Sequence, residues 1–446
     1  MLRLYARIQA SKYNASAYYR TFLPFTFMAK MGFPVAPFID WGEADYSIND
    51  RWQFLGASDI VWAYQLIEEN FPRYINETRG WGSLGRDNNG EERFPPSFVA
   101  CTDDDLFNVT PLNGAFGRLG YKGPNGNELK PGDRVNILGT DGQPMMLWQN
   151  TDPTMEKFTD YAQNKKLVGA WRDSMMLSEL TIVSTQGCAD AVIREGLDPK
   201  KVHIFPNCVD IAEYPQVALD RPKDRIKILF QGSTTHHEDL WPLRDAFGKL
   251  ARKYKNIDWT FWGINYSWVA DYLPKENVTF SPWVDYRGYG SRLATIGHHI
   301  NIAPLSPTTF NQSRSAIKWY ESSAVYHPAA TVAQKTGAYP REIQHGETGM
   351  LFETPEQFYD CVAELIEDPT KRETMASNAK DWVLENRRPE DHVKVLHDKL
   401  VEVREARKLW PVPRAAKRRV AKARKKEVKR VSKKQPHARK RKKPNR

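Results

Sequence analysis

The stretch from Ile300 to Glu321 contains the residues of this chain best suited to bind an anionic ligand. Residues 300–304 form an apolar run typical of a buried strand, and Ser315 is expected to open a helix that carries Lys318 and Glu321. Residues three apart are neighbours on a helix surface. Free backbone N–H groups at the helix start also favour a negative charge. These features suit a ribose diphosphate, and a solvent-exposed, salt-bridging helix face is the alternative.

A row of three acidic residues offers a second kind of chemistry. Residues 98–101 are expected to form a short strand, and Asp103, Asp104 and Asp105 follow directly after Thr102. Carboxylates at a strand end could deprotonate or orient an acceptor hydroxyl. They could instead hold a metal ion, because hard cations prefer oxygen ligands. A helix cap with surface acids is the third interpretation.

Alternating strands and helices must position these residues. Apolar runs typical of strands alternate with segments typical of helices over residues 2–205 and again over residues 226–386. Such alternation indicates parallel sheets covered by helices on both faces. Two such units form a ligand cleft at the carboxyl ends of their strands. The expected helices include 16–31 with a kink at Pro24, 157–180, 239–254, 315–325, 355–368 and 369–386, and residues 114–142 are expected to leave the core.

Length and composition exclude several classes of protein. A chain of 446 residues fits two domains plus extensions, and 41% apolar residues suffice for two buried cores. No run of 18 uncharged apolar residues predicts a membrane-spanning helix, and the N-terminus lacks the pattern of a secretory signal. The four cysteines lie far apart, so neither a zinc site nor a disulfide framework is expected. We therefore expect a cytoplasmic protein with no membrane partner.

The charge is concentrated at one end of the chain. Residues 414–446 contain 18 of the 65 basic residues and one of the 54 acidic ones, so residues 1–413 have 47 basic and 53 acidic residues, a net charge of −6. The tail has too few apolar residues to fold and is expected to be disordered. Its density of charge predicts binding of DNA or RNA through phosphates, and the alternative is a solubilising extension. The candidate nucleic-acid-binding residues are Arg414, Lys417, Arg418, Arg419, Lys425 and Lys426.

Three segments of the second half, in the same order, resemble the GT-B-fold glycosyltransferases, and most closely the large retaining family 4. They are Pro206-Asn-Cys-Val-Asp210, Ser315-Ala-Ile-Lys-Trp-Tyr-Glu321, and Thr336-Gly-Ala-Tyr339 with His345-Gly-Glu-Thr-Gly-Met-Leu-Phe352. The match covers residues 180–383, whereas the first 180 residues match only in general architecture. The resemblance implies an α/β chain with two Rossmann-like, doubly wound domains facing a cleft. It also implies a nucleotide sugar as donor substrate, no further cofactor and a retaining outcome.

The resemblance gives the chain an expected organisation. We expect an N-terminal Rossmann-like acceptor domain (1–222) and a C-terminal Rossmann-like nucleotide-sugar donor domain (223–385). A C-terminal helix (386–412) is expected to return to the body, before the disordered Lys/Arg-rich tail (413–446).

Glu321 occupies the position of the family's second glutamate in a Glu-x7-Glu pattern, which holds the donor ribose. Ser313 stands where the first glutamate would lie near the transferred sugar, so Asn311 or Ser313 is expected to bind a sugar hydroxyl there. The family's basic pair after the first strand of this domain is also missing. His236 and His237 are possible substitutes.

The remaining candidates follow from the chemistry. A departing nucleoside diphosphate gains negative charge, which preorganised cations and N–H donors stabilise. Lys318, the helix start at Ser315 and the turn Gly232–Ser233 are the candidates. Trp283 follows a strand end where the base would lie, with a plain core residue as the alternative. Arg20 could reach across the cleft from the other domain, and a helix-surface cation is the alternative.

The resemblance also favours one of the roles considered for the three acidic residues. The donor pattern argues against a GT-A enzyme with an Asp-x-Asp metal site. We therefore assign Asp103, Asp104 and Asp105 to the acceptor, expect no obligate metal, and count Lys318 with them as catalytic.

The expected function is transfer of a sugar from a nucleotide sugar to an acceptor hydroxyl. Phages encode DNA-base glycosyltransferases with GT-B folds, and the basic tail would hold such an enzyme on its polymer. DNA with a modified base is therefore the expected acceptor, in the host cytoplasm if a phage encodes the chain. Protein or glycan acceptors are the alternative. A nucleic-acid-binding protein with an inactive transferase fold is the second alternative.

Overall fold

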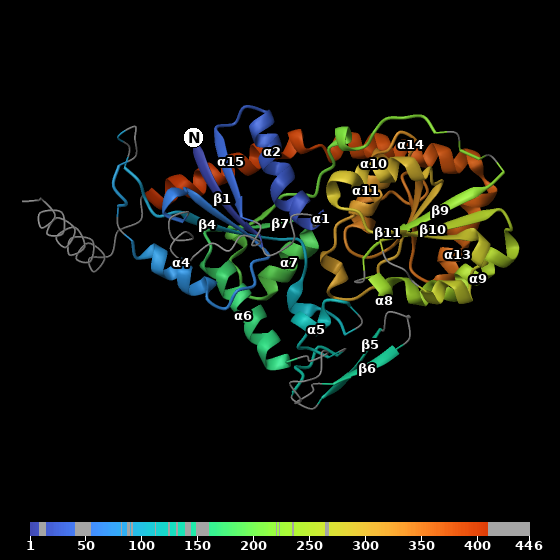
Figure 1. The fold of residues 1–446 in the computed structure, drawn as a ribbon, viewed down its shortest axis with the longest axis horizontal. Helices are drawn as coiled ribbons and strands as arrows, with labels where there is room; N and C mark the ends of the chain where they lie inside the picture. The colour runs from blue at the N-terminus through green and yellow to red at the C-terminus, as the bar shows by residue number, and fades with distance from the viewer. Residues whose placement is uncertain are drawn as a thin grey trace, which may run out of the picture.

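Two six-stranded parallel sheets follow one another along the chain, together with a two-stranded antiparallel ribbon (Figure 1). The computed structural model describes residues 1–8, 15–40, 55–81, 83–86, 90, 92–111, 113–123, 125–130, 133–138, 144–148, 160–219, 221–222, 224–233, 236–263 and 267–408. The expected basic tail and its six candidate residues lie outside the described residues.

The first sheet has the strand order β2-β1-β3-β4-β7-β8. Its strands are β1 (Leu2–Ile8), β2 (Val35–Asp40), β3 (Ile60–Tyr64), β4 (Ser97–Thr102), β7 (Leu180–Val183) and β8 (Val202–Ile204). Every residue of β3 and β4 is buried, which is why both strands have few polar residues. The helices of this half are α1 (Ala15–Ala17), α2 (Leu23–Lys30), α4 (Phe71–Arg79), α5 (Phe116–Leu119), α6 (Tyr161–Leu177) and α7 (Gln186–Arg194).

The expected kink at Pro24 takes a specific form. A π-helical turn, Tyr18–Phe22, separates α1 from α2, and Pro24 lies in the first turn of α2. Proline has no N–H, and its ring clashes with the carbonyl four residues earlier, so a regular helix cannot pass through it. The wider turn buries both Tyr19 and Arg20.

The second sheet has the order β11-β10-β9-β12-β13-β14. Its strands are β9 (Ile226–Gln231), β10 (Ile257–Gly263), β11 (Val278–Pro282), β12 (Ile300–Ala303), β13 (Ala330–Gln334) and β14 (Met350–Phe352). Its helices are α8 (His237–Leu240), α9 (Arg244–Lys253), α10 (Tyr286–Ile296), α11 (Ile317–Ala324), α12 (Tyr339–Glu342), α13 (Pro355–Glu367) and α14 (Pro369–Asn386).

Two of the expected helices differ from those observed. The helix expected at 239–254 is interrupted by a 3-10 turn, Trp241–Leu243, because Pro242 cannot donate a hydrogen bond inside a helix. The helix expected from Ser315 begins instead at Ile317, so Ser315 lies before the helix rather than at its first turn.

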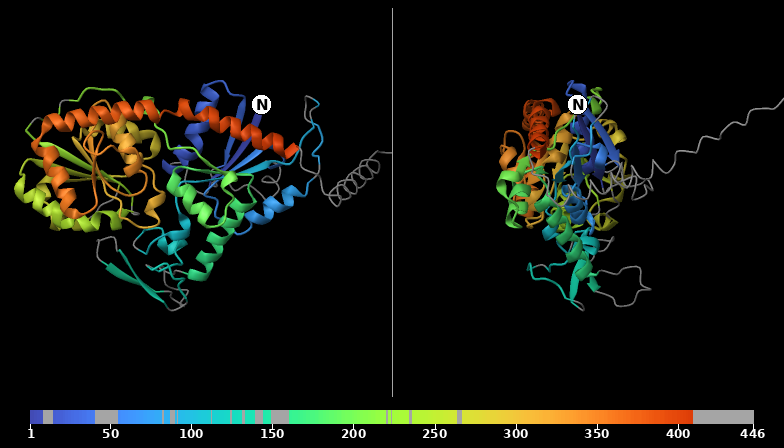
Figure 2. Two further views of the ribbon diagram at one scale, coloured as in Figure 1. Left: turned by 180° about the vertical axis from the view of Figure 1, so that it is seen from behind. Right: turned by 90° about the vertical axis from the view of Figure 1, so that its left-hand side faces the viewer.

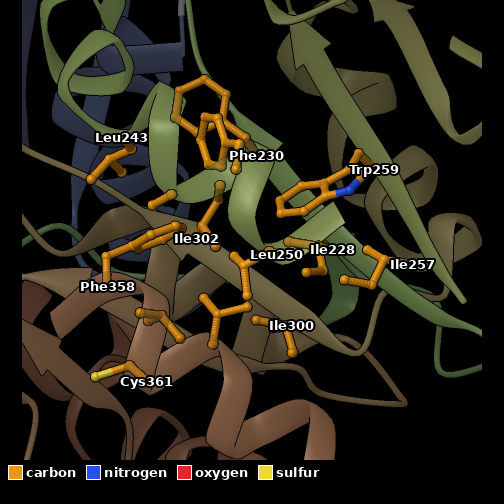
Figure 3. Close-up of a cluster of buried hydrophobic side chains, with 14 of the residues drawn as sticks. Ile228, Phe230, Leu243, Leu250, Ile257, Trp259, Ile300, Ile302, Phe358 and Cys361 are labelled. Carbon is orange, nitrogen blue, oxygen red and sulfur yellow. The ribbon is translucent and has the colours of Figure 1, made fainter. Parts of the chain in front are cut away.

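The sheet of the second half is buried on both faces. On one face Ile228 and Phe230 pack with Leu250 of α9 and Phe358 of α13, as Figure 3 shows. On the other face Leu229 joins a separate buried cluster. Side chains alternate between the faces of a strand, so burial of both faces requires consecutive apolar residues such as Ile228-Leu229-Phe230 of β9.

The C-terminal helix links the two halves. Figure 2 shows α14 beside the second sheet and α15 (Pro389–Lys408) beside the first. Val393, Leu396 and Leu400 of α15 are buried in the cluster that contains Leu4 of β1 and Phe25 of α2. The last described helix, α15, therefore packs against the half of the molecule that contains β1.

An antiparallel ribbon extends from the body of the first half. It consists of β5 (Arg134–Leu138) and β6 (Pro144–Trp148) and lies apart from both sheets in Figure 1. It lies in and just after the Gly- and Asn-rich stretch that was expected to leave the core. Among the described residues, no helix is long and apolar enough to cross a bilayer.

Candidate functional site

Strand order determines where a ligand can bind. In the second sheet the connections turn in opposite directions after β9 and β12, and in the first sheet after β1 and β3. Ligands of doubly wound sheets bind beyond the carboxyl ends of the strands at such switch points. Residues that follow β1, β9 and β12 line one pocket of about 170 Å³ between the two halves. Eight predicted residues line it, namely Asp103, Gly232, Ser233, His236, Trp283, Ser315, Lys318 and Glu321.

Glu321 is buried at the base of this pocket. Its Oε1 accepts a hydrogen bond of 2.5 Å from the Tyr19 hydroxyl, which comes from the other half of the molecule. Its Oε2 accepts bonds from the Tyr289 hydroxyl at 2.8 Å and the Gln231 amide at 3.3 Å. Burial raises the pKa of Glu321 to about 7, and the two tyrosine hydroxyls and the charge of Lys318 oppose the rise. The solvent-exposed alternative for this residue is therefore wrong.

We expect Tyr19→Phe to lower the free energy of unfolding by about 1.5–3 kcal/mol, the usual range for a hydrogen bond to a charged group. Urea denaturation of wild type and variant measures the change. Tyr326→Phe is the matched control, because Tyr326 is 44% exposed and should change stability by less than about 0.5 kcal/mol. Equal midpoints for Tyr19→Phe and wild type would contradict the expected contribution.

Lys318 is half-buried on the side of the pocket formed by the second half. Its Nζ lies 4.9 Å from the centre of the Phe230 ring and 3.2 Å from Nε2 of His236. Burial lowers the pKa of Lys318 to about 7; Asp239 opposes the shift and Arg314 adds to it. An anion in the pocket would favour the charged form of this amine.

Arg314 is a pocket residue that we did not single out from the sequence. It forms an ion pair with Asp104 of the first half, and its NH2 lies 3.4 Å from Nε2 of His236. Arg314 precedes Lys318 by four residues, so the sequence places a second cation just before the helix. This spacing could have identified Arg314 as a candidate site residue. Arg314 and Lys318 together bring two basic side chains to the pocket.

The three aspartates divide between different environments. Asp103 lines the pocket and accepts bonds of 2.9 Å from the Tyr64 hydroxyl and the Gln65 amide. Burial and the neighbouring Asp104 raise the pKa of Asp103 to about 6. Gln65 has a φ of +42°, an unusual backbone conformation for a residue with a side chain.

Asp105 does not belong to the pocket. It is 1% exposed and caps a 3-10 turn by accepting from the N–H of Phe107. Its own N–H donates to Ser313 Oγ at 3.0 Å, across the two halves. The helix-cap interpretation of the acidic row therefore applies to Asp105.

Two other expected ligand-binding residues are buried among protein groups. Asn311 donates 2.9 Å bonds to Asp239 and to the Ser306 carbonyl, and Ser313 donates to the Phe310 carbonyl. Neither lines the pocket, so, contrary to the expectation, neither is placed to bind a sugar hydroxyl there.

Arg20 was expected either to reach across the cleft or to lie on a helix surface, and it does neither. Its side chain is fully buried and donates to the Phe205 carbonyl at 2.5 Å and to Asn207 Oδ1 at 3.1 Å. The Asn207 amide donates in turn to Ser315 Oγ at 2.9 Å, and both of these residues line the pocket. Arg20 thus stabilises two residues of the pocket wall, Asn207 directly and Ser315 through it, without lining the pocket itself.

Aromatic residues of the second half also line the pocket. Trp283 is 46% exposed and lines it, so the core interpretation of this residue is wrong. Trp262 stacks on Tyr289 with ring centres 4.6 Å apart, and its indole N–H donates to the Pro282 carbonyl at 2.9 Å. Flat apolar surfaces and backbone groups of this kind can receive a nucleotide base.

A second cavity adjoins the pocket on the first half. It has a volume of about 290 Å³ and shares Ser16, Ser233 and Arg314 with the pocket. Asp104 and Gln65 line it together with apolar residues of the first half. Among the described residues, no group of three His, Cys, Asp or Glu side chains could hold a metal ion.

Comparisons with known proteins establish the fold. The structure resembles that of Anabaena HepE in complex with UDP-glucose, with a TM-score of 0.55 and 13% identity over 91% of this chain and 100% of that one. It also resembles a sucrose-phosphate synthase from Thermosynechococcus elongatus, with a TM-score of 0.55 and 11% identity over 91% and 100% of the two chains. A glycosyltransferase from Rickettsia africae gives a TM-score of 0.52 and 10% identity over 90% and 98%.

The chain therefore has the GT-B fold, and the expected fold class of two Rossmann-like, doubly wound domains is confirmed. No protein-family model matches the sequence. No curated protein matches it either.

Proposed function

We propose that the chain is a glycosyltransferase that moves a sugar from a nucleotide sugar to an acceptor hydroxyl. The observation that carries this proposal is the meeting of Glu321, Lys318 and Arg314 at one switch point, with Asp103 facing them from the other half. In this arrangement Glu321 holds the ribose, the two cations hold the diphosphate and Trp283 lies beside the base. The sugar would then point toward Asp103 and the second cavity, where the acceptor enters.

The expected chemistry is displacement of the diphosphate from the anomeric carbon. Arg314 and Lys318 stabilise the charge that develops on the leaving group. Asp103, held by Tyr64 and Gln65, orients or deprotonates the acceptor hydroxyl. As part of the proposal the reaction retains the anomeric configuration, as in family 4, and proceeds without an obligate metal.

The proposed acceptor is a modified base in DNA, with a protein or a glycan as the alternative. The support for DNA is the sequence of the tail, with its 18 basic residues and one acid. Residues 1–413 carry a net charge of −6 and would not attract a polyanion without it.

Ligand-induced stabilisation tests the proposed donor site. UDP, GDP and ADP are added to the full chain and the melting temperature is measured, with each parent nucleoside as the control for the diphosphate. A ligand at 100 times its dissociation constant stabilises by about 2.7 kcal/mol. If no diphosphate raises the melting temperature, the chain is better explained as a nucleic-acid-binding protein with an inactive transferase fold.

We expect Asp103→Asn to lower the rate of sugar transfer about 10²–10⁴-fold, the usual contribution of a general base. Binding of the nucleoside diphosphate should be unchanged, because the carboxyl faces the acceptor. The wild-type rate should rise with pH through about 6 as this buried carboxyl ionises. Asp173→Asn is the control, because Asp173 is an exposed partner of Arg172. A variant with the wild-type rate and pH profile would remove Asp103 from the mechanism.

A further inference from the structure

His236 forms a dyad with Asp239. Its Nδ1 lies 2.6 Å from Asp239 Oδ2, and both residues are buried. The other oxygen of Asp239 accepts from the Ser306 N–H at 2.7 Å and the Asn311 amide at 2.9 Å. These bonds fix the carboxylate, which in turn fixes the His236 ring with Nδ1 as a donor.

The second ring nitrogen of His236 faces the pocket. It lies 3.2 Å from Lys318 Nζ and 3.4 Å from Arg314 NH2. Both neighbours are donors, so Nε2 accepts and the ring is neutral.

Several charged groups act on this ring from the elements packed against it. Burial, Lys318 and Arg314 hold the pKa of His236 well below its usual value, and Asp104 opposes them. Asp239 and His237 belong to its own element, and Glu238 there is turned toward Thr110. The ring is therefore kept neutral chiefly by burial and by two cations that a bound anion would engage.

We propose that His236 is a ligand of the donor diphosphate and takes up one proton when a nucleotide sugar binds. An anion between Lys318 and Arg314 neutralises both cations and draws their N–H groups away from Nε2. The freed nitrogen can then accept a proton and donate it in a hydrogen bond to a phosphate oxygen. Asp239 stabilises the imidazolium, as a carboxylate behind a histidine does. This inference rests on the proposed function, because it requires a nucleotide sugar in the pocket.

Proton uptake on binding means that the donor binds more weakly as pH rises. For one proton the dissociation constant rises at most about tenfold per pH unit. Lys318, with its pKa lowered to about 7, would give an effect of the same sign. A background in which residue 318 keeps its charge and does not titrate is therefore needed, and Lys318→Arg provides it.

The experiment is isothermal titration of the full chain with UDP-glucose at pH 7.5 in two buffers of different ionisation enthalpy. UDP-glucose is the ligand of one structural neighbour, and its diphosphate oxygens do not titrate near this pH. The difference between buffers reports the number of protons taken up. Lys318→Arg should take up close to one proton, and Lys318→Arg with His236→Gln close to none. Melting temperatures show whether each variant is folded.

The outcomes distinguish failure of this inference from failure of the proposed function. Proton uptake that is the same with and without His236→Gln overturns this inference and leaves the proposed function standing. Absence of proton uptake in Lys318→Arg, with UDP-glucose bound, overturns it as well. If wild type binds neither UDP-glucose nor GDP-glucose nor ADP-glucose, the proposed function fails, and the role of His236 fails with it.

Discussion

Lys318→Ala is expected to lower kcat for sugar transfer about 10²–10³-fold, the usual cost of removing one preorganised group that stabilises developing charge. The Lys318 ammonium lies against the ring of His236 and over that of Phe230, so it can turn to a ligand without first leaving a carboxylate partner among the described residues. The leaving diphosphate gains charge as the bond to the sugar breaks, so the interaction strengthens in the transition state. We therefore expect kcat to fall more than KM rises.

Steady-state kinetics with a nucleotide sugar measures this change. Lys335→Ala is the matched control, because Lys335 is an exposed lysine of the same half, paired with Glu353 at 2.6 Å. It should leave kcat and KM unchanged. Wild-type kinetics for Lys318→Ala would remove this lysine from the site.

Local sequence patterns were sufficient for much of the fold. The expected strands 98–101 and 300–304 correspond to β4 and β12, because both are mainly apolar stretches followed by polar or turn residues. The expected helix 369–386 coincides with α14, which is capped by Asp368 and starts at a proline.

Part of the site was also predictable, because it depends on local spacing. Lys318 and Glu321 share one helix, and the helix start follows a strand end, so their common position could be inferred from the residues alone. The contact between Arg314 and His236 at the pocket could not be predicted in this way. It depends on Arg314 and His236 meeting in space, although they are 78 residues apart.

The roles of the other residues around the site depend on burial and on contacts between the two halves. Ser313 and Asn311 have side chains that could bind a sugar, but Ser313 accepts from Asp105 N–H, 208 residues away. Tyr19 reaches Glu321 across 302 residues, and its direction follows from the π-helical turn before Pro24. Residue type and spacing alone contain no information on such pairings.

Removal of Arg414–Arg446 is expected to abolish tight binding to DNA while leaving the body folded. The described chain ends with α15, which packs on the first half through Val393, Leu396 and Leu400, all before the cut. A protein that neutralises six to ten phosphates loses about 10³–10⁵-fold in affinity between 50 and 200 mM salt. The full chain should show this steep dependence, and the truncated chain should show weak binding with a flat one.

Fluorescence anisotropy with duplex DNA at several salt concentrations measures both effects. The matched control keeps the length of the tail but replaces its 18 basic residues by glutamine, which separates charge from chain length. It should behave as the truncated chain does, because phosphate contacts depend on charge. Transfer to a short soluble acceptor should be unaffected by either change. Transfer to long DNA should fall steeply and recover partly at low salt. If the truncated chain binds and modifies DNA as the full chain does, the tail is not the nucleic-acid-binding segment, and the acceptor must be sought among proteins and glycans.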